Sequence, residues 1–431
     1  MNKKKDVLVL GAALFSMFFG AGNLIFPPYL GMVAGYKWVL AIIGFLLTGV
    51  GLPFLGIVAS SKAGGDVDKL GRKVSPAFAK FLGITIVIAI GPLLAIPRTG
   101  ATAFEMGIQP IFPNISPIVS AIIYFAICLF FVIKPNDVMD KIGKILTPGL
   151  FLLLTVLIVK GIVDPIGSPV ESTLDSSFPY GFLEGYQTMD ALAAILFGGV
   201  ISASLASYGY TDEKEKMSMT IKAGMIAILG LAFVYGGLGY LGATSGSLYT
   251  VDIDRTKLIM NISNDVLNSF GKYGLGLAVM LACLTTSVGL TATVGQYFNQ
   301  ISNGKLKYEM IVIVTCIFSA AMSVGGVEKI ISLAAPILSF MYPIVIVLIL
   351  MTVFLSKYIK NENVYKFAIY AALIVSAIES LTLFIGNNQL VNIINKLPLS
   401  SSGFAWLIPA LVGGIVGSFI PSKNKENVVG A

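Results

Sequence analysis

Uncharged apolar stretches long enough to cross a lipid bilayer dominate this chain of 431 residues. The segment from Tyr273 to Gly304 contains no Asp, Glu, Lys or Arg, and about 20 predominantly apolar residues span the hydrocarbon core as a helix. Only 12% of all residues are charged, against about 25% in a typical soluble domain. Because lipid offers no hydrogen-bond partners to the backbone, such stretches must be helical. The sequence therefore predicts an all-α polytopic membrane protein.

Apolar runs of this kind recur along the whole sequence, and we predict 12 transmembrane helices. Their approximate limits are 7–34, 37–60, 77–105, 116–134, 143–164, 186–210, 218–243, 271–301, 308–327, 329–356, 364–386 and 402–421. With the N-terminus inside, the inner connecting segments contain about three times as many Lys and Arg residues as the outer ones. Basic residues accumulate on the cytoplasmic side of membrane proteins. We therefore expect a multi-pass protein of the cytoplasmic membrane, with both termini cytoplasmic and no nucleic-acid partner despite a net charge of +7.

Side chains suited to enzymatic chemistry are scarce. The chain contains no His and only three Cys residues, each within an apolar stretch. Imidazole metal sites and Ser-His-Asp triads are therefore excluded, and the cysteines form no metal-ligand or disulfide pattern. The segment Gly237–Gly242 fits G-x-G-x-x-G, but it lies inside an apolar span rather than after a strand, which excludes nucleotide binding. We expect a protein that is not an enzyme and uses no cofactor.

Glycines, an amide and two prolines interrupt the first predicted span. Gly20 and Gly22 flank an alanine, and Asn23 and the pair Pro27-Pro28 follow. A broken helix frees carbonyl groups that can face a cation, and the next half-helix begins with N–H groups that can hold a carboxylate. The alternative is that the glycines only permit close helix packing. The combination within nine residues favours a break.

The sixth predicted span carries Asp190, which about twenty uncharged residues follow. An ionisable residue inside the membrane is a functional hypothesis by default. The alternative is a carboxylate that caps a helix beginning at the membrane interface. A break in this span is expected either at Thr188–Asp190 or at Phe197–Gly199, where two glycines follow a phenylalanine.

Two further spans carry polar groups that need an explanation. Arg98 lies in a third span that two prolines should kink; we expect its side chain to extend to the outer interface, with a role as a gate as the alternative. In the eighth span, the side chains of Thr286 and Ser287 and the carbonyl group of Cys283 would present neutral oxygens of the kind that a small hard cation prefers. The alternative is that these hydroxyl groups bond back to the preceding turn of their helix.

The two suspected breaks occupy corresponding positions in the chain. Each opens a block of five spans, and interrupted helices at matching positions of two halves indicate the central binding site of a secondary transporter. Because five is an odd number, the second block must have inverted topology. We predict one transmembrane transporter domain over residues 1–431, with five-helix repeats at 7–164 and 180–356 and two additional helices at 364–421.

Three strings carry a resemblance to a known family. They are Gly20-Ala21-Gly22-Asn23-Leu24-Ile25-Phe26-Pro27-Pro28, Gly91-Pro92-Leu93-Leu94-Ala95-Ile96-Pro97-Arg98-Thr99 and Glu184-Gly185-Tyr186-Gln187-Thr188-Met189-Asp190-Ala191-Leu192. Over essentially its whole length, the chain resembles the bacterial branched-chain amino acid:cation symporters of the amino acid–polyamine–organocation superfamily. The resemblance implies a LeuT-like fold, with helices 1 and 6 broken, and sodium-coupled import of leucine, isoleucine and valine by alternating access. A proton-coupled carrier with Asp190 as the titrating group is the alternative.

The same resemblance implies binding residues. The sodium site between spans one and eight would use the carbonyl groups of Ser16, Phe19 and Cys283 and the oxygens of Thr286 and Ser287, with Thr285 in place of Thr286 if the register shifts by one residue. The substrate site would use Phe18, Ala21, Gly22, Tyr186, Met189 and Asp190. The N–H groups of Ala21 and Gly22 would receive the substrate carboxylate, and Asn23 matches an asparagine that binds a second sodium in some relatives. The expected partners are the branched-chain substrate, sodium as the coupling ion and the lipid bilayer; the oligomeric state is not predicted.

Overall fold

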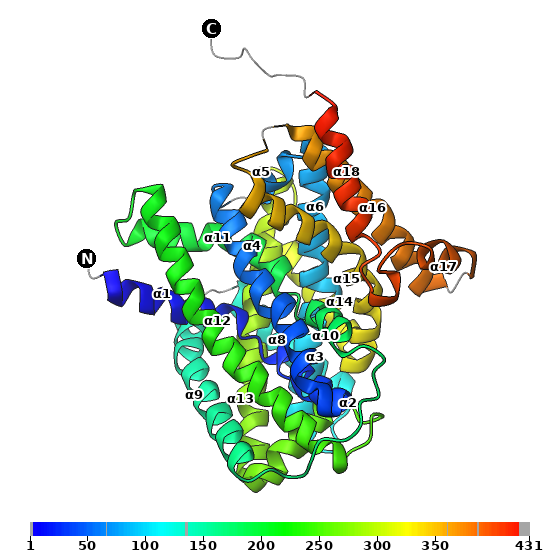
Figure 1. The fold of residues 1–431 in the computed structure, drawn as a ribbon. Helices are drawn as coiled ribbons and strands as arrows, with labels where there is room; N and C mark the ends of the chain where they lie inside the picture. The colour runs from blue at the N-terminus through cyan, green and yellow to red at the C-terminus, as the bar shows by residue number, and fades with distance from the viewer. Residues whose placement is uncertain (1–2, 66, 134–136, 360, 386–387, 422–431) are drawn as a thin grey trace. The chain divides into compact units, whose positions relative to one another are not determined.

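The computed structural model describes residues 3–65, 67–133, 137–359, 361–385 and 388–421, which are helical apart from short connections (Figure 1). Eight helical runs in this described part are long and apolar enough to cross a membrane: Phe26–Lys62, Pro76–Ile108, Leu146–Val163, Asp190–Ser207, Glu213–Ser247, Arg255–Ile301, Val327–Leu355 and Glu362–Ile385. Three shorter apolar helices are Pro117–Ile133, Tyr308–Ser323 and Leu407–Phe419. The all-helical prediction is confirmed, and the count of 12 spans stays a prediction.

The described residues up to Val163 form nine α-helices and several short 3₁₀ or π-helical turns, which are labelled η. These elements are α1 (Lys3–Phe18), η1 (Ala21–Asn23), α2 (Phe26–Ala34), η2 (Gly35–Lys37), α3 (Trp38–Leu46), η3 (Leu47–Gly51), α4 (Leu52–Lys62), α5 (Val67–Arg72), α6 (Pro76–Ile88), η4 (Ala89–Leu93), α7 (Ala95–Thr102), η5 (Ala103–Ile108), α8 (Pro117–Ile133) and α9 (Asp137–Val163). The kink expected in the third span lies in η4, where Gly91 leaves helical geometry next to Pro92. Proline has no N–H group and cannot continue the helical hydrogen-bond pattern.

The second part contains the remaining elements. They are α10 (Ser177–Glu184), η6 (Gly185–Thr188), α11 (Asp190–Ser207), α12 (Glu213–Thr244), η7 (Ser245–Ser247), α13 (Arg255–Ile301), α14 (Tyr308–Ser323), α15 (Val327–Leu350), η8 (Met351–Leu355), α16 (Glu362–Ile385), α17 (Asn388–Asn395), η9 (Ser400–Ser402) and α18 (Leu407–Phe419). Helix α13 starts well before the predicted start of the eighth span at residue 271, and it is kinked at Asn268. Hydropathy missed this first section because it is amphipathic, with Leu258, Ile262 and Val266 buried at helical spacing.

The chain divides into two compact units. Unit 1 comprises Met1–Phe54, Thr85–Ala193 and Ser218–Ala335, and unit 2 comprises Leu55–Ile84, Ala194–Met217 and Pro336–Ala431. Each unit combines segments from both predicted five-helix repeats. The boundaries of the repeats themselves stay a prediction.

Within unit 1, α13 is the helix around which several others pack. It contacts α7, α8, α9 and α14 as well as the short turns η1 and η5, and its yellow-green ribbon runs beside α9 in Figure 1. Helix α10 packs against α3 in the same unit. The short turn η1 is therefore held directly against the eighth span.

Within unit 2, α16 and α18 pack closely against each other (Figure 1). Glycines make this approach possible: a Cβ atom at Gly413 would lie 2.5 Å from the carbonyl oxygen of Phe367, and one at Gly417 would lie 2.4 Å from that of Asn363. Small residues at helix contacts are typical of membrane proteins, where backbones approach closely.

Large apolar side chains cover the outer face of α8. Its exposed members are Ile118, Val119, Ile122, Ile123, Ile127, Phe130 and Ile133. A soluble monomer rarely exposes a continuous apolar surface of this kind. The surface fits a helix that faces lipid.

Candidate functional site

The first span is broken, as predicted. Helix α1 ends at Phe18, a tight turn follows in which the N–H of Gly20 donates to the carbonyl oxygen of Phe18 (2.8 Å), and α2 begins at Phe26. Between the two helices, the N–H of Asn23 donates to the carbonyl oxygen of Gly20 (2.9 Å). Phe18, Phe19 and Asn23 are all buried. The segment between Phe18 and Phe26 therefore places main-chain polar groups in the protein interior.

The sixth span is also broken, and the break lies at the first of the two expected positions. Helix α10 ends at Glu184, Met189 takes a left-handed conformation with φ of 61°, and α11 starts at Asp190. The alternative position at Phe197–Gly199 is wrong, because this segment is helical within α11. A left-handed non-glycine residue costs about 1–2 kcal/mol, so surrounding contacts must hold Met189 in this state.

The two breaks face each other. The turns η1 and η6 are in contact, and Nδ2 of Asn23 donates to both carboxylate oxygens of Asp190, at 3.1 and 2.9 Å. Only 8% of Asp190 is exposed. Asp190 therefore lies in the interior and is bonded to the opposite break, so it does not cap a helix at a solvated interface.

Arg98 completes this arrangement, and our expectation that it extends to the outer interface is wrong. It is 4% exposed; its Nη1 donates to the carbonyl oxygen of Gln187 at 2.5 Å and its Nη2 to Oδ1 of Asn23 at 3.3 Å. Its guanidinium carbon also lies 5.2 Å from the ring centroid of Phe26. The two breaks each supply an acceptor, and Asp190 supplies the opposite charge, so the side chain is stabilised inside. We call Asn23, Arg98, Gln187 and Asp190 the central cluster.

One buried polar atom of the central cluster, Oε1 of Gln187, has no hydrogen-bond partner within the part of the chain that the structure describes. The hydroxyl of Tyr235, on α12, is also buried and lies beside Asn23, Asp190 and Arg98. Buried polar atoms are normally paired, so Oε1 of Gln187 is a candidate partner for a ligand. The opposite charges of Arg98 and Asp190 were a signal for their pairing, whereas the sequence contained no signal for Tyr235.

The remaining residues of the predicted substrate site lie around the breaks. Tyr186 and Met189 are buried, and Ala21 begins η1. The backbone of Gly22 runs beside Arg98, since a Cβ atom there would lie 3.5 Å from Nε of that residue. The structure therefore brings the predicted substrate residues to the two facing breaks.

The side-chain hydroxyl groups of the residues predicted to bind sodium make other bonds in this structure. Oγ of Ser16 is 2.9 Å from Oγ1 of Thr147, and the hydroxyl of Thr286 donates to the carbonyl oxygen of Ala282 at 2.9 Å. The Thr286 bond to the preceding turn of its own helix is the alternative to sodium binding that the sequence analysis gave. Ser287 bonds to Thr99 of α7 and Tyr124 of α8. Phe19 and Cys283 are buried. Although η1 packs against α13, the sodium site itself stays a prediction.

A second charged cluster, which the sequence analysis missed, surrounds Arg255 at the start of α13. Its Nη2 lies 3.1 Å from Oε1 of Glu184, and its Nη1 lies 2.6 Å from Oε2 of Glu328. The guanidinium also stacks 4.2 Å over the ring centroid of Tyr29. We call these four residues the Arg255 cluster. It joins α13 to the end of α10, the start of α15 and α2.

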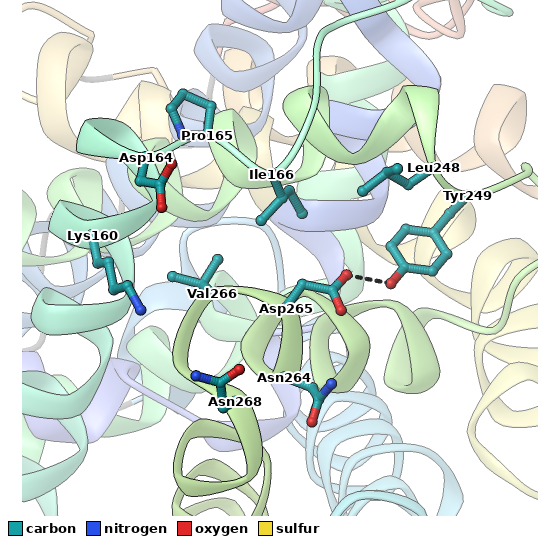
Figure 2. A pocket seen from close by; sticks show the side chains of 10 residues that line it. All are labelled: Lys160, Asp164, Pro165, Ile166, Leu248, Tyr249, Asn264, Asp265, Val266 and Asn268. Atoms are coloured by element: carbon teal, nitrogen blue, oxygen red, sulfur yellow. Dashed lines mark hydrogen bonds between the residues drawn. The ribbon is translucent and has the colours of Figure 1, made fainter.

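A cavity of about 680 Å³ lies elsewhere in unit 1 (Figure 2). It is lined by Lys160, Asp164, Pro165, Ile166, Leu248, Tyr249, Asn264, Asp265, Val266 and Asn268. The hydroxyl of Tyr249 donates to Asp265 at 2.5 Å. Burial and this bond raise the pKa of Tyr249, so its hydroxyl stays protonated at neutral pH. The residues predicted to bind the substrate lie at the two breaks, and none of the predicted binding residues lines this cavity.

Comparisons with known proteins agree with this architecture. Residues 3–424 match the family model described as branched-chain amino acid transport protein. The chain is 38% identical to the branched-chain amino acid permease BraB of Bacillus subtilis (strain 168), with 98% of each chain covered. These names describe transporters, not enzymes.

Two solved structures are similar in fold. The inward-facing conformation of Mhp1 has a TM-score of 0.64 at 13% identity, covering 95% of this chain and 90% of that one. A substrate-bound, outward-open Na⁺-coupled sialic acid symporter has a TM-score of 0.50 at 14% identity, covering 98% and 99%. The expected LeuT-like transporter fold is confirmed.

Proposed function

The chain belongs to the branched-chain amino acid transport protein family, and we propose that it imports leucine, isoleucine and valine across the cytoplasmic membrane together with sodium. The contact between the two helix breaks carries this proposal. Interrupted helices with opposed main-chain groups are suited to a small dipolar solute, since each break supplies partners for one end.

The substrate would lie between the breaks as a zwitterion. The N–H groups of Ala21 and Gly22 would bind its carboxylate, and carbonyl groups of η6 with Asp190 would receive its ammonium group. Phe18, Tyr186 and Met189 are buried here and would contact the branched side chain. One methylene group changes binding by only about 1–3 kcal/mol, so this site would accept all three amino acids.

Sodium would bind where the first span meets α13. The carbonyl groups of Ser16 and Phe19, with the oxygens of Cys283, Thr286 and Ser287, form the proposed ligand set. The contact between η1 and α13 supports this set, because it brings the break in the first span next to the helix that carries the other ligands. Sodium would stabilise the outward-open state in which the two spans are tied together, and their separation would release ion and substrate inside, as alternating access requires.

Leucine uptake into proteoliposomes tests the proposal when sodium and pH gradients are imposed separately. We expect uptake to follow the inward sodium gradient at constant pH and to stop when potassium replaces sodium. Competition by isoleucine and valine, but not by lysine or glutamate, would establish the substrate class.

Proton coupling through Asp190 is the second candidate, because this carboxylate is buried at the centre of the site. Uptake that persists without sodium and collapses with the pH gradient would replace the proposed coupling ion by the proton. Absence of leucine uptake under either gradient would contradict the substrate assignment.

A further inference from the structure

Arg98 donates hydrogen bonds to an oxygen of each helix break. Oδ1 of Asn23, the side-chain oxygen that the resemblance assigns to a second sodium, accepts a hydrogen bond from Nη2 of Arg98 at 3.3 Å. Nη1 of the same guanidinium bonds the carbonyl oxygen of Gln187, which belongs to the opposite break. A single fixed cation thus bridges oxygens from both breaks, as a bound metal ion would.

The charge balance of the central cluster also disfavours a further cation beside Arg98. One guanidinium and one carboxylate are buried together, and the amide of Asn23 lies between them, with its oxygen toward Arg98 and its nitrogen toward Asp190. The pair is therefore neutral before any ligand binds. Sodium at Asn23 would lie beside the guanidinium, in a buried region where repulsion between like charges is strong.

The surroundings of the guanidinium hold it in place. The ring of Phe26 covers it at 5.2 Å, and the backbone of Gly22 runs beside its Nε atom. The planar, permanently charged guanidinium is suited to bonding two oxygens in fixed directions at once. Arg98 of α7 therefore links the two breaks to each other.

We propose that Arg98 is a built-in cation that takes the place of a second sodium at Asn23, so that the carrier moves one sodium with each substrate molecule. This inference rests on the proposed sodium symport for its stoichiometry. The assignment of Arg98 to the Asn23 position rests on the hydrogen bonds alone.

The reversal potential of leucine transport by the wild-type protein in proteoliposomes measures the stoichiometry directly. We expect one sodium per leucine and a Hill coefficient for sodium of about 1. A ratio of two sodium ions per leucine, with Arg98 intact, would overturn the inference. If uptake does not depend on sodium, the proposed coupling fails instead, and the Arg98 assignment is judged by the variants below.

Arg98→Gln removes the built-in positive charge, so a cation from solution can pair with Asp190 instead. We expect the thermal stability of this variant in detergent to rise with sodium or guanidinium concentration by more than that of the wild type, and uptake to return at high sodium with a Hill coefficient near 2. Arg98→Lys keeps the charge, so it should need no second sodium, and the Hill coefficient of its residual uptake for sodium should stay near 1. If neither cation stabilises Arg98→Gln or restores its uptake, Arg98 does not replace a cation.

Arg72→Gln is the matched control, since Arg72 forms an exposed pair with Asp68. Its sodium response and stability should match the wild type. If Arg98→Gln does not yield folded protein, the wild-type stoichiometry and the response of Arg98→Lys decide the question.

Discussion

The central cluster and the Arg255 cluster place an arginine against carboxylates in two different ways. Arg98 is nearly completely buried and faces a single carboxylate through the amide of Asn23. Arg255 bonds two carboxylates directly, and one of them, Glu328, has a side chain that is 38% exposed. Water can solvate the partly exposed carboxylate of the Arg255 cluster. In the buried central cluster, only the charge of Asp190 can balance the charge of Arg98. This difference predicts graded effects of substitution.

Asp190→Asn should have the largest effect, because it leaves the buried guanidinium of Arg98 without an opposite charge. Removing one partner of a buried pair typically costs about 3–5 kcal/mol, so we expect that loss in the free energy of unfolding, together with loss of leucine uptake. Denaturation in detergent and uptake assays measure the two effects.

The double variant Asp190→Asn with Arg98→Gln removes both charges and should recover most of the stability but not the uptake. Equal stability of the single and double variants would show that the two side chains do not balance each other.

Thr286→Ala combined with Ser287→Ala should have the next largest effect on uptake, and it separates ion binding from the central cluster. If these hydroxyl groups bind sodium, the sodium concentration for half-maximal uptake should rise at least tenfold, which corresponds to about 1.4 kcal/mol. Thr293→Ala is the control, because Thr293 makes a similar back-bond on the same helix. Unchanged sodium activation of the double variant at normal protein abundance would remove the proposed ion site.

Arg255→Gln should have a smaller effect than Asp190→Asn, since Glu328, one of the two carboxylates that it leaves behind, can still reach water. A lost hydrogen bond to a charged group costs about 1.5–3 kcal/mol, and we expect a decrease of this size in the free energy of unfolding, measured in detergent. The decrease should be larger at low ionic strength, where the facing carboxylates are screened less. Lys257→Gln breaks an exposed pair with Asp254 and should change the free energy of unfolding little. Equal effects of Arg255→Gln and Lys257→Gln would contradict the distinction between buried and exposed ion pairs.

Glu328→Gln should have the smallest effect, because Glu184 continues to bond Arg255. Exposed ion pairs contribute about 0–1 kcal/mol, so the change should be within that range. Glu184→Gln should cost more, since the Glu184 side chain is only 10% exposed. The reverse order in a side-by-side denaturation experiment would show that exposure does not control the contribution of these carboxylates.

The sequence predicted the features that are local in the chain. The glycines around Asn23 located the break in the first span, and the residues near Asp190 marked one of the two positions considered for the break in the sixth span, because the residues that interrupt a helix are close neighbours in sequence. The position of Arg98 was wrong because its partners lie 75 and 89 residues away in sequence, and hydropathy does not encode such pairs. The first section of α13 and its Arg255 cluster were missed for a related reason, since an amphipathic helix with charged ends does not resemble an apolar span.

Gly185, at the break in the sixth span, has a consequence for motion. A methyl group there would lie 2.0 Å from Oγ1 of Thr48 and 2.9 Å from the carbonyl oxygen of Phe45, and Thr48 also donates to the carbonyl oxygen of Phe182 at 2.7 Å. The break thus rests on the second span with no space between them. Any rearrangement that shifts this break must therefore also move the second span, so the smallest moving unit of the carrier contains the break and the second span together.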